Sequence, residues 1–545
     1  MRWRRASDKR GLGVSDDIVK AIEGAEVLVF PGGRAPARAG PPESEAGANA
    51  PPPPDDPPPP EDSEGEGGDI IDALNREWAF VLMGSRAAIM RERPDGPIED
   101  RTRVISIEAF KAYFQNRGIV VKRRERQEDG EYREVRGFRK LAPLWLSSWR
   151  RRTYDGIEFF PDANNAPGTP AYFNLWRGFS VSPDFATPPS ERWKKYFKFQ
   201  DHLKANICDS DLQVYRWVWH WFAHLVQRPR ERIGTAIVLR GKMGTGKTIV
   251  GDVIGSLFSS HYFLVDDPRY LVGQFNAHMA SCLLLQVDEG FWAGDKAAEG
   301  RLKGLVTAPK QMIEAKGVDP IRLDNYVRLL FSSNENWVVP AGMDERRFAV
   351  FDVADHWKED HQRFADLYAE LANGGREALL ADLLSVSLDA KGAPNLRVIP
   401  KTKALLEQKV RSLDPITAWW LGRLIDGSQT HRAANWRHKV PNQTLFNDYL
   451  RTVEKLGVRR RAAETEFGIQ LRRLVPGAES VRSTEDVEVY DEQTFTTTTV
   501  TKRVWCLQFP SLDDCRDAFE AALKQEFPWG EPRERSADEE SEDTT

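Results

Sequence analysis

The chain has 545 residues, of which 41% are hydrophobic and 29% are charged, so we expect two to four folded domains with ordinary hydrophobic cores. Its formal net charge of −5 excludes a protein that is basic throughout, and any contact with DNA has to be local. No run of about 18 apolar residues occurs, no apolar segment follows the basic N-terminus, and the 4 cysteines form no C-x-x-C pair. We therefore expect no membrane partner, no signal peptide and no zinc ribbon, and we predict a cytoplasmic protein.

The N-terminal part of the chain divides by composition. We predict a short segment at residues 1–33, followed at 34–68 by a disordered linker rich in proline, glycine and acidic residues. The first folded domain is then expected at 69–200, as an accessory domain of mixed α+β type. Its expected elements are paired strands at 78–82 and 88–90 around a turn at Gly84, a helix at 107–116, and strands at 157–161 and 172–176.

Basic and aromatic residues alternate near the end of this domain. Residues 150–152 are three consecutive arginines, and they lie close in sequence to Trp145, Trp149 and Tyr154. Arginine binds phosphate and aromatic rings stack on bases, so this stretch could form a nucleic-acid surface. The alternative is a solvated helix end whose tryptophans belong to the core.

A glycine-rich loop at 241–248 fits the pattern G-x-x-x-x-G-K-[ST] of a phosphate-binding P-loop. An apolar, β-branched run at 235–240 precedes it, and residues 248–258 follow with apolar positions at helical spacing, which makes a chance glycine-rich turn a poor alternative. The glycines let backbone amides face the phosphates at the positive end of a helix dipole. Lys247 is expected to bind the β- and γ-phosphates and Thr248 to ligate Mg²⁺. The predicted nucleotide-binding residues are Gly241, Gly244, Thr245, Gly246, Lys247 and Thr248.

A second apolar run, at 282–287, ends in the carboxylates Asp288 and Glu289. An apolar strand that ends in two carboxylates is the Walker B arrangement, in which Asp288 holds Mg²⁺ and Glu289 polarises the attacking water as general base. Such strings are also common by chance, and the preceding P-loop is what favours the assignment.

A third strand is expected at 326–333, and Asn334 follows it. We expect Asn334 to sense the γ-phosphate, with a helix or turn cap as the alternative. Arg346 and Arg347 come shortly after and suggest an arginine finger, which brings positive charge to the transferring phosphoryl group of a neighbouring subunit. The alternative for these arginines is an ion pair with a nearby acidic residue. The sequence does not decide which of the two would act.

Between the second and third strands, Lys316 and Gly317 are expected at the tip of a hairpin. In a ring of subunits this tip would face the pore, where Lys316 could contact the phosphates of a DNA strand. The alternative is an ordinary exposed turn.

Taken in order, the P-loop, the Asp288–Glu289 pair, the lysine-tipped hairpin, Asn334 and the two arginines resemble the superfamily 3 helicases. These are AAA+-related hexameric ring motors of small DNA viruses, poxviruses, phages and plasmids. The strings at 239–242, 273–278, 288–296 and 333–340 are similar to the helicase domain of phage and prophage primase-helicase proteins. From the resemblance we expect the ATPase domain at 201–390. It also implies that the protein works in the cytoplasm of a bacterial or phage-infected cell.

The resemblance implies translocation along single-stranded DNA and unwinding of forked duplex, with ATP and Mg²⁺ as cofactors and a homo-oligomer, a hexameric ring, as the working form. It implies the following roles: Lys247 and Thr248 bind nucleotide and Mg²⁺, Asp288 and Glu289 serve metal and water, Asn334 senses phosphate, Arg346 or Arg347 acts in trans, and Lys316 touches DNA.

Many relatives carry a primase or polymerase module ahead of the motor, which needs clustered catalytic carboxylates and often a zinc site. In this chain the only candidates are Asp155, Glu158 and Asp162, around the expected strand at 157–160. We therefore expect a motor without a primase, and a separate primase or polymerase as a possible partner.

The C-terminal domain is expected at 391–530, with an acidic disordered tail at 531–545. Three helices and a hairpin suggest a winged helix, as in related primase-helicases, whose third helix would contact DNA through Arg472 and Arg473. A purely structural lid is the alternative. The expected elements are helices at 417–424, 443–456 and 466–474 and a hairpin formed by 487–490 and 500–509.

The predicted fold class is therefore α/β, with a P-loop AAA+-like ATPase core between an α+β domain and a winged-helix-like domain. The favoured function is an ATP-dependent replicative DNA helicase of phage or prophage type. The alternatives are an ATP-dependent replication initiator or remodeller without processive unwinding, and a non-catalytic DNA-binding scaffold, against which the intact Lys247, Asp288 and Glu289 argue.

Overall fold

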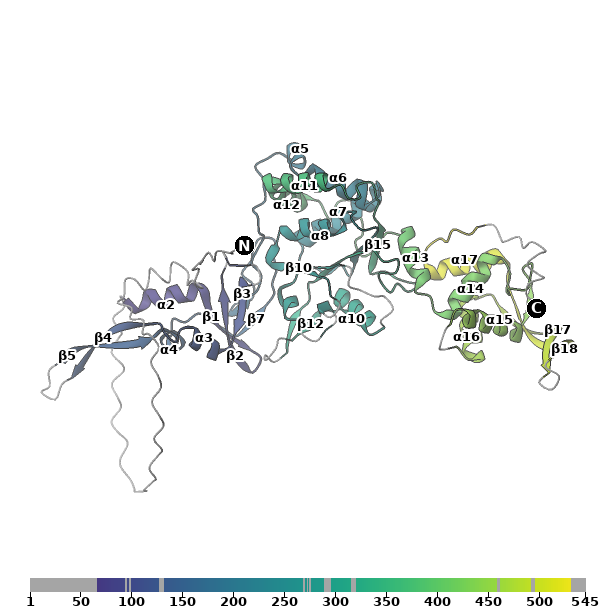
Figure 1. Cartoon of the computed structure of the whole chain (residues 1–545), viewed down its shortest axis with the longest axis horizontal. Coiled ribbons are helices and arrows are strands. Elements are labelled where there is room, and N and C mark those ends of the chain that lie inside the picture. The colour runs from purple at the N-terminus through teal and green to yellow at the C-terminus, as the bar shows by residue number, and fades with distance from the viewer. Residues whose placement is uncertain are drawn as a thin grey trace, which may run out of the picture. The chain divides into compact units, whose positions relative to one another are not determined.

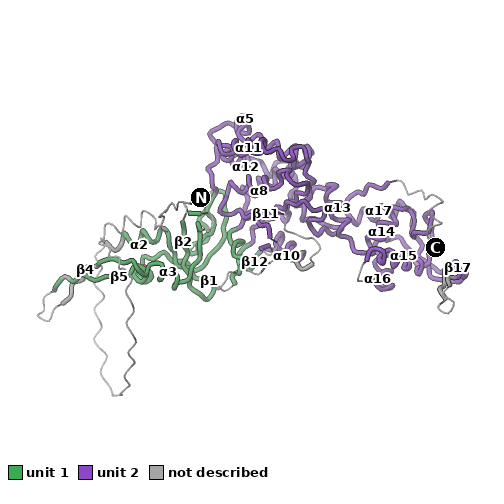
Figure 2. Tube along the Cα trace, viewed as in Figure 1, with its two compact units in different colours: residues 1–178, 275–281, 310–324 green, residues 179–274, 282–309, 325–545 purple. Residues whose placement is uncertain are grey.

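The computed structural model of the chain describes residues 66–530, except for 94–95, 98–99, 127–131, 268–269, 272, 274–275, 289–295, 315–319, 458–460 and 492–495 (Figure 1). The chain divides into two compact units (Figure 2). Unit 1 comprises residues 1–178, 275–281 and 310–324, and unit 2 comprises residues 179–274, 282–309 and 325–545. Across the part of the chain that is described, no helix is both long enough and apolar enough to cross a membrane.

Unit 1 contains a four-stranded sheet of order β3-β2-β1-β6. Its strands are β1 (Trp78–Met83), β2 (Arg86–Glu92), β3 (Thr102–Ile105) and β6 (Thr153–Tyr154). β1 and β2 pair antiparallel with Val81 opposite Ala88. Gly84, at the turn between them, has a φ of 61°, which glycine adopts without strain. The pair of strands predicted around Gly84 is confirmed.

Three helices pack with this sheet around an aromatic core. They are α2 (Glu66–Glu77), α3 (Ile107–Tyr113) and α4 (Leu141–Ser147). Trp78, Phe110, Phe114 and Trp145 are fully buried together and supply most of the apolar surface of this core. The side chain of Ser106 caps α3 by accepting the Ala109 amide at 3.1 Å, so the predicted helix is present and ends earlier than expected.

Other strand pairs of unit 1 lie outside this sheet. They are the antiparallel ribbon of β4 (Gly118–Arg126) and β5 (Tyr132–Lys140), the parallel pair of β7 (Gly156–Glu158) and β8 (Tyr172–Asn174), and the antiparallel hairpin of β12 (Lys310–Ile313) and β13 (Ile321–Asp324). The short helix η5 (Ala277–Ser281) accompanies the hairpin. The strands predicted at 157–161 and 172–176 are both present and both shorter. The ribbon was not predicted.

Unit 2 is built on a five-stranded sheet of order β10-β11-β14-β9-β15 in which all neighbours are parallel. The strands are β9 (Ala236–Arg240), β10 (Tyr262–Val265), β11 (Leu284–Asp288), β14 (Arg328–Ser333) and β15 (Phe348–Asp352). All residues of β9 and β14 are buried, as expected for central strands covered on both faces. Because β14 lies between β9 and β11, the segments that follow these three strands meet at one edge of the sheet.

Helical elements precede, connect and follow these strands. They are α5 (Pro189–Arg192), η2 (Trp193–Tyr196), α6 (Phe197–Asp201), η3 (His202–Ile207), α7 (Leu212–Gln227), α8 (Lys247–Ser256), η4 (Ser259–His261), α10 (Lys296–Thr307), α11 (His361–Glu370), η6 (Leu371–Gly375) and α12 (Arg376–Ser385). Asp211 caps α7 by accepting the amides of Gln213 and Val214. Most apolar residues of α7 are buried, and the helix packs in part against α12, whereas Leu212 in its first turn is exposed.

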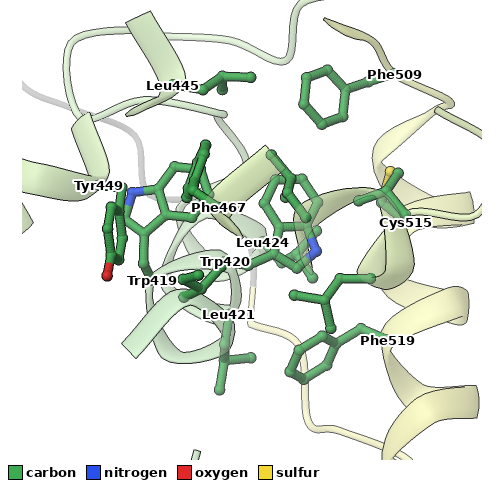
Figure 3. Close-up of a cluster of buried hydrophobic side chains, with 14 of the residues drawn as sticks. Trp419, Trp420, Leu421, Leu424, Leu445, Tyr449, Phe467, Phe509, Cys515 and Phe519 are labelled. Atoms are coloured by element: carbon green, nitrogen blue, oxygen red, sulfur yellow. The ribbon is translucent and has the colours of Figure 1, made fainter. Parts of the chain in front are cut away.

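The C-terminal part of unit 2 combines helices with a small sheet of order β16-β18-β17. Its elements are α13 (Lys403–Arg411), α14 (Pro415–Asp426), β16 (Lys439–Pro441), α15 (Asn442–Lys455), α16 (Glu464–Leu474), β17 (Glu479–Asp491), β18 (Thr496–Gln508) and α17 (Leu512–Leu523). Trp419, Trp420, Tyr449, Phe467 and Phe519 form the centre of its core (Figure 3). The three predicted helices and the predicted hairpin are confirmed, and the hairpin is longer than expected.

Candidate nucleotide-binding site

The glycine-rich loop connects the end of β9 to the start of α8. Gly244 and Gly246 have φ angles of 78° and 80°, a region that glycine adopts without strain. A Cβ on Gly246 would also lie 2.8 Å from both the His202 and Phe364 rings. No side chain caps the first turn of α8, as is required of a helix N-terminus that binds an anion.

The backbone carbonyls of this loop are held by distant residues. The buried Asn206 side chain donates to the Thr245 carbonyl at 2.8 Å, the His202 Nε2 atom bonds the Gly246 carbonyl at 3.0 Å, and the Glu359 amide donates to the Gly244 carbonyl at 3.0 Å. These bonds fix the loop from η3 and from the segment before α11. None of the three residues belongs to a motif, so no sequence pattern pointed to them.

The side chains predicted for phosphate and metal lie close together. Lys247 is only 6% exposed, and its Nζ atom donates to the Gly241 and Lys242 carbonyls at 3.0 and 2.7 Å and to the Asn334 Oδ1 atom at 2.8 Å. Thr248 Oγ1 donates to Asp288 Oδ2 at 2.9 Å. The strand order explains this convergence, because β14, which precedes Asn334, lies between β9 and β11.

A cavity of about 270 Å³ lies at this edge of the sheet. It is lined by Met243, Gly244, Gly246, Lys247, Thr248, Ile249, Asp288, Asn334, His361 and Phe364. His361 and Phe364 come from α11 and were not predicted as site residues. Glu289 and Lys316, which were predicted for water activation and DNA contact, lie outside the described residues.

Gln286 connects β11, the strand that ends at Asp288, to α8, the helix that follows the glycine-rich loop. This fully buried residue of β11 donates through Nε2 to the Thr248 carbonyl at 3.1 Å and accepts the Tyr262 hydroxyl at 2.7 Å. A Cβ on Gly251 of α8 would overlap the Gln286 Oε1 atom. The polar residue in an apolar strand and the glycine in an apolar helix are the two signals that could have revealed this contact.

Replacing Gly251 by alanine is therefore expected to displace Gln286 and to release the Thr248 carbonyl. Overpacking of this kind costs about 1–3 kcal/mol of unfolding free energy, and ATP turnover should fall with it. Urea unfolding and phosphate release measured on one preparation check both effects. Gly300→Ala is the matched control, because a Cβ at that exposed position of α10 meets nothing within 4 Å. Equal behaviour of the two variants would contradict the contact.

His202 is uncharged in this environment. Burial lowers the pKa of His202 to about 4, the Gly246 carbonyl opposes this shift, and the Arg363 guanidinium adds to it. Its ring stacks on Trp357 at 5.4 Å. Because the unfolded pKa is about 6.5, the unfolded chain binds a proton between pH 6.5 and 4 that the folded chain does not bind.

The contribution of His202 to stability is thus expected to be constant above pH 6.5 and to fall as the pH drops toward 4. At pH 5 the His202 contribution amounts to a loss of about 2 kcal/mol of unfolding free energy. Urea unfolding of the wild type and of His202→Gln at pH 7.5 and 5 measures it, and the variant should lack this part of the pH dependence. His356→Gln, at an exposed histidine, is the control and should behave as the wild type. Identical pH profiles for all three proteins would contradict the assignment.

Arg240, the last residue of β9, directly precedes the glycine-rich loop and binds residues from three other segments. Its guanidinium binds Asp352 through two bonds of 2.6 and 2.8 Å, Glu407 of α13 at 2.7 Å, and the Asn336 carbonyl at 3.2 Å. Asn336 lies two residues after Asn334, so Arg240 holds the segment that carries Asn334 beside the P-loop strand.

The two adjacent arginines lie at the opposite edge of the sheet. Arg346 is exposed, and the described residues place no carboxylate within ion-pair distance of it. Arg347 is half-buried, and its Nε atom is fully buried. Glu345, 8% exposed, accepts the backbone amides of both arginines at 2.9 and 2.6 Å.

The glycine-rich loop of the same chain is out of reach of these side chains. The Arg347 carbonyl accepts the amide of Ala236, the first residue of β9, at 2.7 Å. Gly241 lies five residues further along that strand, about 16 Å away at a rise of about 3.3 Å per residue. The geometry is thus compatible with a contact to another subunit and not with one to the same site.

The β12–β13 hairpin is held by Asn276 and by the short helix η5. Asn276 donates to the Met312 carbonyl and accepts the Glu314 amide, both at 2.8 Å. Gln311 donates to the Met279 carbonyl at 3.1 Å. These bonds hold β12 from Gln311 to Glu314, the residue that follows the strand on the side of the hairpin tip.

The basic and aromatic stretch at 150–152 makes contacts within unit 1. Arg150 forms an ion pair with Asp72, Arg152 forms one with Glu92 at 2.5 Å, and the Arg151 guanidinium lies 4.0 Å from the centre of the Phe80 ring. Trp145 belongs to the core, whereas Trp149 is 92% exposed.

The candidate primase carboxylates also have local partners. Glu158 accepts the Thr169 hydroxyl at 2.8 Å, and Asp162 accepts the amides of Asn164 and Ala166. Both carboxylates thus hold the turns between β7 and β8.

The chain is similar to a protein family and to a phage protein. A model of a family of unknown function, DUF5906, matches residues 239–347, a span that contains every residue predicted for the nucleotide site. The DNA primase-polymerase of Nitratiruptor phage NrS-1 is 26% identical over 239 residues, which cover 43% of this chain and 32% of that protein. The chain therefore matches about a third of the length of this relative.

Two solved apo structures of the C-terminal region of NrS-1 are similar in fold. Each has a TM-score of 0.52 at 16% identity and covers 80% of this chain, with 97% and 98% of the solved chains covered. At this identity the likeness shows the fold alone. The mixed α/β architecture with its parallel sheet is therefore shared with the C-terminal region of a phage replication protein.

Proposed function

We propose that this chain is an ATP-dependent DNA helicase of the phage primase-helicase type, with a superfamily 3, P-loop AAA+-like core. The observation that carries the proposal is the convergence of Lys247, Thr248, Asp288 and Asn334 on one cavity at the carboxyl edge of a parallel sheet. Ligands of open α/β sheets bind outside this edge. An ammonium, a hydroxyl, a carboxylate and an amide are also the groups that a triphosphate with Mg²⁺ requires.

In this proposal the phosphates of ATP lie against the first turn of α8. The Lys247 ammonium exchanges loop carbonyls for phosphate oxygens, and its bond to Asn334 keeps both side chains on the same phosphate. Thr248 and Asp288 would hold Mg²⁺, which when bound neutralises phosphate charge. Glu289, the residue after Asp288, would accept the proton of the attacking water.

A second subunit would complete the site. The exposed Arg346 guanidinium has no acidic partner among the described residues and lies at the edge of the sheet away from its own P-loop. A ring of copies would bring it to the γ-phosphate of a neighbour, where an arginine finger stabilises transition-state charge. We therefore favour Arg346 as the finger over the half-buried Arg347.

Contact with DNA is proposed at two places. Lys316 would follow a DNA strand at the tip of the β12–β13 hairpin, and Asn276 holds the end of β12 that leads into this tip. A winged-helix role for the C-terminal part is supported by the exposed Arg472 and Arg473 on α16, followed by the long β17–β18 hairpin. The similarity to a phage DNA primase-polymerase supports a role in phage DNA replication.

Strand displacement from a labelled forked duplex tests the proposal. The full chain should release the strand with ATP and Mg²⁺ and should not release it with a non-hydrolysable analogue. ATP hydrolysis stimulated by DNA, without displacement at any protein concentration, would instead support an initiator or remodeller. Failure to bind ATP would exclude both.

A further inference from the structure

The β4–β5 ribbon of unit 1 has no role in the site described above. Its two strands pair only with each other, from Gly118 opposite Lys140 to Arg126 opposite Tyr132, and they extend away from the four-stranded sheet (Figure 1). A two-stranded ribbon of this kind is marginally stable by itself. Packing therefore does not explain why the chain extends it so far beyond the core.

The β4–β5 ribbon has a positive net charge, whereas the whole chain has a negative one. Each strand has nine residues, among them four lysines or arginines and a single glutamate. The whole chain has a net charge of −5, and the other long ribbon, β17–β18, has more acidic than basic residues. Positive charge is thus concentrated on one projecting element.

The described side chains of β5 lie in solvent on both faces of the ribbon. Arg133, Val135, Arg139 and Lys140 are all exposed. Successive residues of a strand point to opposite faces, so Arg133 and Arg139 share one face and Lys140 occupies the other. Arg133, Arg139 and Lys140 have no ion-pair partner among the described residues.

The base of the ribbon is fixed to the domain. Ile119 is 5% exposed and belongs to the core of unit 1, and the Leu141 amide donates to the Arg117 carbonyl at 3.1 Å. A Cβ on Gly118 would overlap the Phe138 ring, which therefore covers that glycine closely. The ribbon is an anchored projection and not a loose loop.

We propose that the β4–β5 ribbon is a binding element for double-stranded DNA that inserts into the major groove. The major groove admits a two-stranded β-ribbon, and cations on both faces would meet the phosphates of both groove walls. A single strand is bound instead in a positively charged groove with aromatic platforms, whereas this element is a two-stranded ribbon that pairs with no other strand. The assignment does not rest on the ATPase, because the ribbon lies outside the nucleotide site.

The salt dependence of binding to a blunt duplex, measured without nucleotide, tests the ribbon. The variant Arg133→Gln/Arg139→Gln/Lys140→Gln should lower the slope of log affinity against log salt by about 2.7, at about 0.9 per phosphate contact. Between 0.05 and 0.2 M salt the wild-type affinity should then fall about 40-fold more than that of the variant. Lys391→Gln/Lys401→Gln/Lys403→Gln removes the same charge from exposed positions elsewhere and should keep the wild-type slope.

Photocrosslinking locates the contact directly. The four native cysteines are buried, so a thiol-reactive photocrosslinker attached to Val135→Cys reports on the ribbon alone. Val135 is 37% exposed, and Val398, 59% exposed in unit 2, is the matched control position. Val135→Cys should crosslink to duplex and Val398→Cys should not.

Two results would overturn this assignment. One is an unchanged salt slope together with equal crosslinking from both positions. The other is crosslinking and a slope change with single-stranded DNA only, which would make the ribbon a single-strand contact. Neither result depends on ATP hydrolysis, so failure of the ribbon and failure of the proposed motor can be told apart.

Discussion

Replacing Lys247 by alanine is expected to lower ATP turnover by at least about 100-fold, the scale on which the loss of one preorganised charge donor acts. The reason is geometric: the Lys247 ammonium is the buried cation that the loop directs at the cavity, 2.8 Å from Asn334. Steady-state phosphate release with MgATP and single-stranded DNA measures the effect. The fold should persist, because the lysine donates only to loop carbonyls and to Asn334 among the bonds described above.

Lys242→Ala is the control within the same loop. The Lys242 side chain is exposed and forms an ion pair with Asp355 at 2.6 Å, away from the cavity lining. We expect its turnover to remain within a few-fold of the wild type, as an exposed ion pair contributes little. Turnover by Lys247→Ala equal to that of Lys242→Ala would remove the P-loop assignment.

Replacing Arg346 by alanine is expected to lower turnover by about 10³-fold, the lower end of the effect of an arginine finger. Nucleotide affinity should change little, because the guanidinium would act on transition-state charge from a neighbouring subunit. Arg347→Ala should affect stability more than turnover, since its Nε atom is buried. Turnover and nucleotide binding are measured together for both variants.

Mixing the two inactive variants tests whether the site is shared. In an equal mixture of Lys247→Ala and Arg346→Ala chains, about a quarter of the sites would pair an intact lysine with an intact arginine from the next copy. Phosphate release should therefore return to roughly a quarter of the wild-type rate. Absence of rescue at every mixing ratio would mean that each site works within one chain.

The motifs of the site were predictable because each is local. The glycine loop, Asp288 and Asn334 each follow an apolar run that the sequence marks as a strand. Parallel strands end at the same edge of a sheet, so these residues were expected near one another. The strand order that places β14 between β9 and β11 depends on long-range packing and was not predictable from local patterns.

The residues that support the loop were missed for a related reason. His202 and Asn206 are 44 and 39 residues from the loop carbonyls that they bind, and Glu359 is more distant still. Each contributes one hydrogen bond, which leaves no periodic pattern. The C-terminal helices were predicted because their buried residues recur at helical spacing. Strand β4 was missed because its run of cations does not show the alternation of apolar and polar residues that is typical of a strand.

Electron cryo-microscopy of the full chain with single-stranded DNA, Mg²⁺ and a transition-state analogue of ATP is the sharpest test of a site shared between subunits. We expect a closed ring in which each analogue lies against Lys247 and Thr248 of one subunit and faces Arg346 of the next. A nucleotide bound elsewhere, or an Arg346 side chain that faces solvent while the analogue is held within a single subunit, would contradict it.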